Sequence, residues 1–437
     1  MPIAQALYTG VTGISVNSDS MSIIANNIAN ANSTGFKRDR AEFEDMITEN
    51  LNGGAQIGRG SRLANVKTMH SQGGMKVTDN ITDIAIQGSG FFVISSPEAE
   101  QDVSAGRLYS RVGNLHFDKD GYFATPSGGR VQGYAADSDG KLSSRMSDIR
   151  IETNSIPPRP TDKILLNVQL DSRVETLTEP FNPLKPEATS HFNTAVTVFD
   201  SHGRGHSAVV YFRKLDSSMD GISWEWKALV NGSEVIDPEE GELKQFAEGV
   251  VKFDKHGFLA EENQGLSEVN FSNGAFPKQK IDFDFGRNLM TEKGNGTNAS
   301  SSIAGKSITN FHQQNGYEAG QIKSMGIGLD GLVTGIFTNG IQRVLGGIAL
   351  ATFSNEAALV KTGKNLFSNS IHSGPANIGL PKTGTRGSLV SSSLEESNVD
   401  IASEFIDMIT TQRLFQANSR SITTADNLIE EIINLKR

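Results

Sequence analysis

The fold is decided by two terminal stretches, IAQALYTGVTGISVNSDSMSIIANNIANAN over residues 3–32 and IASEFIDMITTQRLFQANSRSITTADNLIEEII over residues 401–433. Both place apolar residues at seven-residue steps, the first at Leu7, Ile14, Met21 and Ile28, the second at Ile401, Met408, Phe415, Ile422 and Ile429. The intermediate positions hold Val11, Ser18 and Ala25 in the first stretch, and Phe405 and Ile433 in the second. A heptad repeat keeps one seam of a helix facing a partner. The pattern predicts two terminal helices that pack either against each other, as an intramolecular coiled coil, or against other subunits.

Neither terminal helix is expected to be stable alone. Gly10, Gly13 and several Asn residues weaken the first helix, because both residue types are poor helix formers. Even a helix of about 30 residues needs tertiary packing when its propensity is low. We therefore predict that the two ends of the chain fold together, or on contact with a partner.

Between the helices the apolar period changes from helical to two, which is typical of β-strands. Asp83–Gly88 and Phe91–Ile94 are predicted to be paired strands, and Asp-Gly at 120–121 and 330–331 predicts hairpin turns. The middle of the chain is more acidic, with 17 basic and 24 acidic residues over 146–310, a net charge of 17 − 24 = −7. It also holds both tryptophans, Trp224 and Trp226, which we expect to serve packing.

The predicted fold is therefore mainly β with terminal α-helices, in which one β domain is inserted into another. The predicted parts are a terminal helical polymerisation domain (1–35 and 396–437), irregular or extended linkers (36–72 and 385–395), a core β domain (73–145 and 311–384) and an inserted outer β domain (146–310).

Composition excludes several classes of function. The net charge of −10 and the lack of a basic stripe disfavour nucleic-acid binding, and the absence of Cys excludes disulfides and thiolate metal sites. No apolar run is long enough for a transmembrane helix, so we expect no direct membrane insertion. The N-terminus lacks the cationic region of a cleavable signal peptide, which leaves a cytoplasmic location or export by another route.

No catalytic, cofactor-binding or metal site is predicted. The Asp-x-Asp-Gly sequences at 118–121 and 137–140 lack the further ligands of a calcium loop and are interpreted as turns. His202 and His206 are four residues apart, but glycines flank them between strands, so zinc binding is disfavoured. Because nucleophile and phosphate-loop motifs are also missing, we expect a protein that is not an enzyme.

The segment NNIANANSTGFK over residues 26–37 resembles the N-terminal signature of bacterial flagellar rod and hook proteins. Further blocks resemble the same family, namely 83–94, 348–353 with 363–367, 412–419 and 434–437. Within the family, the large insertion and the segment 196–203 are most similar to the hook branch, although His202 stands where a Leu is expected.

The resemblance implies a structural subunit that leaves the cell through the flagellar type III export apparatus, without a cleaved signal peptide, and polymerises with copies of itself into an extracellular helical tube. Hook subunits form a curved universal joint that transmits torque from rod to filament. The implied partners are rod proteins, a hook cap, a hook-length control protein and a hook–filament junction protein. The candidate subunit-packing residues are Leu7, Val11, Ile14, Met21, Ile28, Asn30, Phe36, Ile401, Phe405, Met408, Gln412, Phe415, Asn418, Ile422 and Ile429.

Two other hypotheses stay open at this point. One is a distal rod subunit of the same family, which the large insertion over 146–310 disfavours. The other belongs to a different class, an extracellular β-rich enzyme or adhesin whose ends form a coiled-coil stalk. That hypothesis predicts a secretion signal and a catalytic or carbohydrate site in the insertion.

Overall fold

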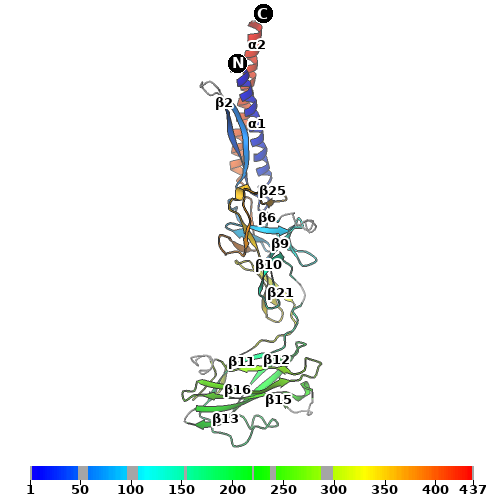
Figure 1. Cartoon of the computed structure of the whole chain (residues 1–437), viewed down its shortest axis with the longest axis vertical. Coiled ribbons are helices and arrows are strands. Elements are labelled where there is room, and N and C mark those ends of the chain that lie inside the picture. Colours follow the sequence, from blue (N-terminus) through cyan, green and yellow to red (C-terminus); the bar gives the residue numbers. More distant parts are fainter. Residues whose placement is uncertain are drawn as a thin grey trace. The chain divides into compact units, whose positions relative to one another are not determined.

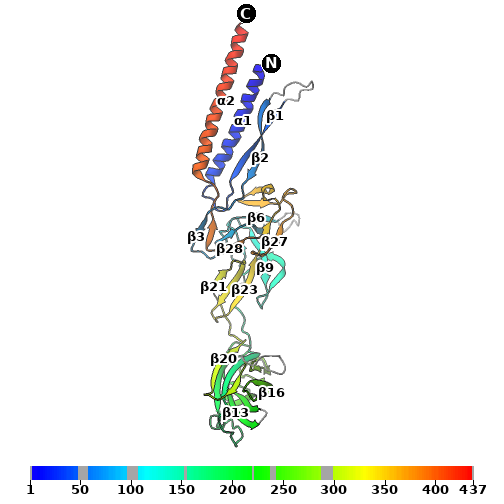
Figure 2. The ribbon, with the colours of Figure 1, turned by 90° about the vertical axis from the view of Figure 1, so that its left-hand side faces the viewer.

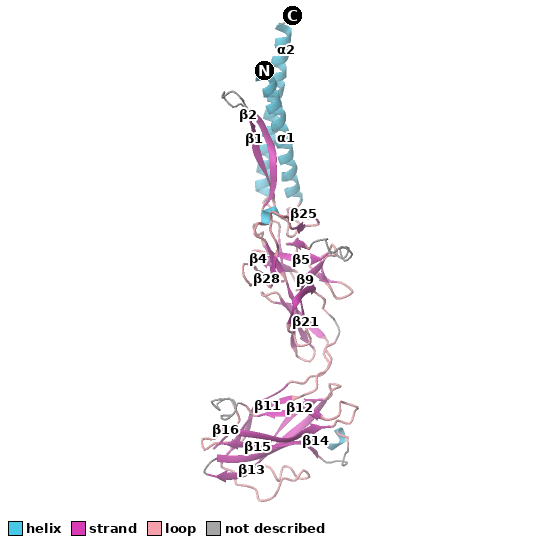
Figure 3. Ribbon diagram, viewed as in Figure 1, coloured by secondary structure: helices cyan, strands magenta, loops and turns pink. Residues whose placement is uncertain are grey.

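The computed structural model describes residues 2–47, 58–95, 107–151, 155–218, 221–236, 243–286 and 299–435. It confirms a mainly β protein with one long helix at each end (Figure 3). The chain divides into two compact units. Unit 1 comprises 1–153, 323–336 and 342–437, and unit 2 comprises 154–322 and 337–341.

The terminal helices of unit 1 are α1 (Pro2–Ala29) and α2 (Ile401–Leu435), and they pack against each other (Figures 1 and 2). Helix α2 begins later than the predicted residue 396, because Asp400 caps it. The Asp400 carboxylate accepts hydrogen bonds from the N–H groups of Ala402 (2.9 Å) and Ser403 (3.3 Å). Helix α1 ends at Ala29, three residues before the end of the stretch 3–32 that was predicted to be helical.

The segment predicted to be irregular over 36–72 instead contains a long antiparallel hairpin, which corrects that prediction. Strand β1 (Asp39–Ile47) pairs with β2 (Gly58–Thr68), and β2 packs along α1 (Figure 1). Residues 48–57 of that segment lie outside the described residues. Most side chains of the hairpin are exposed or half-buried. Because the alternation of apolar and polar residues is therefore weak, the sequence does not predict these strands.

Below the helices, unit 1 is built on one branched sheet whose main path runs β21-β22-β23-β9-β5-β6-β26-β25. These strands are β21 (Ile322–Ile327), β22 (Leu332–Phe337), β23 (Gln342–Ile348), β9 (Arg130–Ala136), β5 (Phe91–Ser95), β6 (Leu108–Ser110), β26 (Leu366–Ser368) and β25 (Val360–Gly363). Side strands of the same sheet are β7 (His116–Phe117), β8 (Phe123–Ala124), β10 (Leu142–Asp148), β24 (Leu350–Thr352) and β27 (Asn377–Gly379). The short 3₁₀ helix η3 (Glu356–Ala358) precedes β25. A buried aromatic cluster around Phe91, Tyr109, Phe353 and Phe367 forms the core of this unit.

The strands predicted to pair over 83–94 both exist but do not pair with each other, so that detail of the prediction is wrong. Strand β4 (Ile84–Gln87) pairs with β28 (Ser388–Ser391), whereas β5 pairs with β6, β9 and β24. Gly88 and Gly90 lie between the two strands with φ of 100° and 136°, a backbone that redirects the chain. A second short pair, β3 (Met75–Val77) with β29 (Ser393–Glu395), likewise joins the N-terminal half to the segment before α2.

Unit 2 is a sandwich of two sheets. The larger is antiparallel, in the order β12 (Phe192–Phe199), β13 (Gly205–Ser218), β14 (Gly221–Asn231), β15 (Leu243–Phe253), β16 (Leu259–Val269) and β17 (Gln279–Lys280). The smaller is centred on β11 (Lys163–Asp171), which is parallel to β18 (Asp282–Asp284) and β19 (Ser301–Ile303) and antiparallel to β20 (Ile308–Gln314). The 3₁₀ helix η2 (Gly232–Glu234) follows β14.

Alternate residues of β11 and β13 fill the core of unit 2, together with Trp224 and Trp226, which are fully buried. The indole N–H of Trp224 donates to the Ser302 hydroxyl across the core, at 3.2 Å. The expectation that the tryptophans serve packing is therefore confirmed. The boundaries of the insertion differ from 146–310. Ile149 and Ile151 still donate backbone hydrogen bonds within unit 1, to Val131 and Gly121.

Candidate assembly surface

The two helices run antiparallel, and small residues of α1 form the seam between them. A Cβ atom at Gly10 would lie 2.7 Å from Ile422 Cγ1, and one at Gly13 would lie 2.6 Å from Asn418 Nδ2. Seventeen residues further along α1 than Gly10, the amide of Asn27 reaches the Glu404 carboxylate at 3.2 Å. Because glycine has no Cβ, the two helices approach more closely than larger side chains would allow.

Met408, Ile422 and Ile429 lie in the seam, as the seven-residue repeat predicts. The intermediate positions are shifted by one residue, to Gly10 and Glu404 instead of Val11 and Phe405. On α2 the buried and half-buried residues follow one another at steps of four and three, except for a step of seven across the exposed Phe415. They include Glu404, Met408, Thr411, Asn418, Ile422, Ala425 and Ile429. On α1 the buried positions include Gly10, Asn17, Ile24 and Asn27. Several seam positions carry small or polar residues, which a search for apolar heptads cannot detect.

The candidate subunit-packing residues fall into three groups in the structure. Leu7, Ile14, Met21, Ile28, Asn30, Met408, Asn418, Ile422 and Ile429 are half-buried. Val11, Ile401, Phe405, Gln412 and Phe415 are exposed. All of these except Gln412 therefore lie off the seam on which the heptads placed them. Phe36 is buried outside the helices, where the Lys361 ammonium lies 5.1 Å from the centre of its ring.

Much of the apolar surface of the helix pair is exposed and has no partner among the residues that the structure describes. The exposed large apolar residues on the two helices are Tyr8, Val11, Ile401, Phe405, Ile406, Ile409, Leu414, Phe415, Leu428, Ile432 and Ile433. Ile406 and Ile433 are 64% and 62% exposed. Exposed apolar patches of this extent mark interaction sites in soluble proteins.

A buried polar cluster fixes the base of the helix pair to the β core. The Lys37 ammonium lies 2.6 Å from Glu395 Oε1, with neither side chain accessible to solvent, and Arg111 Nη1 lies 3.4 Å from Glu395 Oε2. Burial lowers the pKa of Lys37 and that of Arg111, while the Glu395 carboxylate opposes both shifts. Because Lys37 follows α1 and Glu395 precedes α2, this cluster ties both ends of the chain to one point.

A second part of the cluster surrounds Asp39 at the start of the β1–β2 hairpin. Asn27 of α1 exchanges two hydrogen bonds with the Asp39 backbone, at 2.8 and 2.9 Å, and Lys361 donates to both Asp39 carboxylate oxygens at 2.7 Å. Arg38 forms ion pairs with Glu404 and with Asp407, both on α2. Helix α1, helix α2, the hairpin and the β core therefore all meet in one hydrogen-bonded network.

Gly35 also belongs to this junction. Its position after α1 suggests a C-terminal helix cap, but its N–H group binds the segment before α2 instead. Its φ is 68°, and its N–H donates to the Glu395 carbonyl at 2.8 Å. A Cβ here would lie 2.9 Å from the Arg111 carbonyl carbon. The STGFK sequence at 33–37 is thus shaped by a close approach of the N- and C-terminal segments.

Sequence reasoning missed the charged members of the junction, namely Lys37, Arg111, Glu395 and Glu404. Lys37 stands inside the segment that carries the family resemblance, but single charged residues in polar stretches give no sign of burial. Only the pairing of segments more than 300 residues apart brings Lys37 to Glu395.

The other motifs weighed as binding sites have structural roles. In the Asp-Gly turns the aspartate carboxylates accept backbone N–H bonds, as Asp118 does from Asp120 and Tyr122, which confirms their interpretation as turns. His206 is buried between Asp200 and Glu234, with its ring stacked on Phe271. Within the described ranges, no cluster of three or more His, Asp or Glu side chains has a metal-binding arrangement. None of the helices in that part of the chain is long and apolar enough to cross a membrane.

Comparison with known proteins places a chain with these features in the class of flagellar rod and hook proteins. Four family models match parts of the chain: flagella basal body rod protein (residues 7–37), flagellar hook protein FlgE/F/G D1 domain (85–168), flagellar basal body protein FlaE D2 domain (169–317) and flagellar basal body rod FlgEFG protein C-terminal (390–435).

Relatives match over the full length of the chain. The flagellar hook protein FlgE of Treponema pallidum is 32% identical, with 99% of this chain and 100% of the relative covered. FlgE of Borreliella burgdorferi is 31% identical over 99% of each chain, and FlgE of Escherichia coli is 28% identical over 99% and 100%. The crystal structure of Helicobacter pylori FlgE2 shares the fold, with a TM-score of 0.54 at 15% identity, and covers 73% of this chain and all of that one.

The chain belongs to the flagellar hook protein FlgE family. It is a structural subunit of the bacterial flagellar hook, serves motility and is not an enzyme.

Proposed function

We propose that this subunit polymerises with copies of itself through the exposed apolar faces of α1 and α2, and that the polymer is a curved helical tube acting as a universal joint between rod and filament. The observation that carries the proposal is the row of exposed apolar residues on helices whose seam is already filled within the chain. A helical polymer requires heterologous contacts, in which one patch meets a different patch on the next subunit. The two helices offer two such patches.

In this proposal the helix pair forms the subunit contacts that stay in place, and unit 2 forms subunit contacts that can shift as the tube bends. Apolar contacts on the helices resist sliding, because exposing them to water again is costly. Unit 2 carries 16 basic and 23 acidic residues over 154–322, a net charge of 16 − 23 = −7. Polar interfaces of that kind permit relative motion, which a bending joint needs.

The candidate packing residues fit two roles within this proposal. Val11, Ile401, Phe405, Gln412 and Phe415 are exposed and are proposed to contact neighbouring subunits directly. The half-buried candidates Leu7, Ile14, Met21, Ile28, Asn30, Met408, Asn418, Ile422 and Ile429, together with Phe36, are proposed to shape the helix pair that presents those contacts.

The remaining proposals concern the path of the subunit and its partners. We propose export through the flagellar type III apparatus without a cleaved signal peptide, and a final position in the extracellular hook. The proposed heterologous partners are rod proteins, a hook cap, a hook-length control protein and a hook–filament junction protein. Co-purification of tagged subunits with each of these partners tests this set one partner at a time.

Electron microscopy of the purified chain after salting-out tests the central proposal, beside a copy that lacks residues 1–29 and 401–437. Curved tubes from the full chain alone are expected. Straight tubes would favour the distal rod hypothesis. Monomers from the full chain under several precipitants would contradict polymerisation through the ends.

A further inference from the structure

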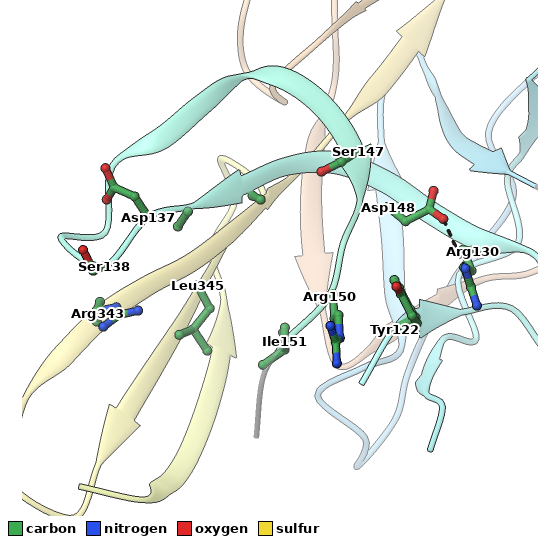
Figure 4. A pocket seen from close by; sticks show the side chains of 12 residues that line it. Tyr122, Arg130, Asp137, Ser138, Ser147, Asp148, Arg150, Ile151, Arg343 and Leu345 are labelled. Carbon is green, nitrogen blue, oxygen red and sulfur yellow. Dashed lines mark ion pairs between the residues drawn. The ribbon is translucent and has the colours of Figure 1, made fainter. Parts of the chain in front are cut away.

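A cleft of about 640 Å³ opens in unit 1 between the β9–β10 hairpin and β23. Figure 4 shows Arg343 and Leu345 on one side of the cleft and Tyr122, Arg130 and Arg150 on the other. Two carboxylates, of Asp137 and Asp148, also line it.

Both carboxylates are already engaged within the unit. Asp137 accepts the backbone N–H groups of Asp139 (3.0 Å) and Lys141 (2.8 Å) in its own turn. Asp148 accepts from the Ser95 hydroxyl at 2.7 Å and lies 3.7 Å from Arg130. Among the described residues, they leave the other guanidinium groups of the cleft without a carboxylate partner.

Arg150 and Arg343 have no carboxylate partner among the residues that the structure describes. The Nε of Arg343 is buried and has no hydrogen-bond partner there. Arg150 donates to the Asp120 carbonyl at 3.1 Å and lies 5.7 Å from the Tyr122 ring, over which Arg130 stacks at 3.9 Å. These contacts hold the guanidinium groups of Arg150 and Arg130 at the rim of the cleft. A guanidinium group can bind a carboxylate through two parallel hydrogen bonds.

An acidic loop of unit 2 offers the complementary chemistry. The loop between β11 and β12 carries Glu175, Glu179 and Glu187, which are exposed and form no ion pair within the described ranges. The loop is held in place by Arg213, which donates to the Leu177 carbonyl at 3.0 Å, and by Lys214, which donates to the Val174 carbonyl at 2.9 Å.

We propose that the arginine cleft of one subunit binds the β11–β12 loop of a second copy of this chain, through its glutamate carboxylates on Arg150 and Arg343. This inference rests on the proposed polymerisation. In a polymer the second copy is held at a high effective concentration, so even a partly screened ion pair is populated. The contact is polar and can break and re-form as the tube bends.

Matched charge removal tests the contact. R150Q/R343Q is expected to raise the critical concentration for polymerisation about tenfold, and E175Q/E179Q/E187Q should do the same. Combining the two sets should add little further effect, because both remove one contact. R145Q, which removes an exposed arginine outside the cleft, and E268Q/E318Q, which removes two exposed carboxylates elsewhere on unit 2, should polymerise normally.

Photo-cross-linking identifies the occupant directly. Arg343→p-benzoylphenylalanine, polymerised with isotope-labelled subunits, should cross-link to a peptide of residues 172–191 from another copy. Cross-links to a different segment, or additive effects of the two variant sets, would overturn the inference. Equal polymerisation of R150Q/R343Q and wild type would overturn it as well. Failure of the wild-type chain to polymerise would instead contradict the proposed function.

Discussion

Lys37 Nζ and Glu395 Oε1 lie 2.6 Å apart with both side chains fully buried, and they join the segment that follows α1 to the segment that precedes α2. Lys37 also donates to the Ser71 carbonyl at 2.8 Å, and Glu395 accepts the Gly73 N–H at 3.0 Å. A buried pair satisfied on all sides fixes geometry more than it adds stability. In a joint that passes torque, this pair holds the helices and the β core in one orientation.

Removing one partner of this pair should be costly. Lys37→Met leaves the buried Glu395 carboxylate with Arg111, at 3.4 Å, as its one cationic partner among the described residues, and we expect a loss of about 3 kcal/mol in the free energy of unfolding of unit 1. Chemical denaturation with separate probes for the two units measures it. Lys67→Met, which removes an exposed ammonium 3.9 Å from Glu42, is the control and should change stability by less than about 1 kcal/mol. A similar small change for Lys37→Met would show that the pair does not hold the junction.

The glycine seam makes a second prediction. Gly10→Val places a branched side chain against Ile422, and overpacking of this kind costs about 1–3 kcal/mol. The helices should move apart and the critical concentration for polymerisation should rise, while the melting of unit 2 stays unchanged. Calorimetry and pelleting assays report the two effects. Ser15→Val, at an exposed position of the same helix, is the matched control.

The sequence was informative where local chemistry governs structure. Asp-Gly turns and the two terminal helices follow from a few neighbouring residues. The positions of Leu7 and Ile14 on a helix could be predicted in the same way.

What could not be predicted depends on contacts between distant segments. The intermediate positions of the seam were misplaced by one residue because Gly10 and Glu404 carry no hydrophobic signal, although the close packing of the two helices depends on Gly10. The hairpin over 39–68 was missed because its strands rest one face on α1 and leave most side chains in contact with water. Strand β4 was paired with the wrong neighbour because β28 is about 300 residues away in the sequence.

His70 predicts a pH dependence of unit 1. Burial, with help from the nearby cations Arg111, Lys37 and Lys361, lowers its pKa to about 4. Between pH 6.5 and 4 the unfolded chain therefore binds a proton that the folded chain does not, so stability falls as pH falls through this window, by up to about 3 kcal/mol. Its ring packs edge-on against Phe91 and Phe367, both at 5.4 Å. Chemical denaturation of His70→Phe and of wild type between pH 4 and 7.5 isolates this contribution. If the free energies of unfolding of the two proteins change with pH in parallel, His70 makes no such contribution.

Charge on the exposed apolar face of α2 should block assembly without unfolding the protein. In Ile406→Asp the new carboxylate stays solvated in the monomer, where Ile406 is 64% exposed, but would be desolvated at an apolar subunit contact. We expect pelleting after salting-out to be lost and the melting temperature of both units to stay within about 2 °C of wild type. Phe415→Asp, at 37% exposure, should behave alike, whereas Ile422→Asp should also weaken the helix pair, because Ile422 contacts Gly10. Gln416→Asp places the same charge at an exposed polar position of α2 and should assemble normally. Normal tubes from both Ile406→Asp and Phe415→Asp would mean that this face of α2 points to the lumen and that subunit contacts lie elsewhere.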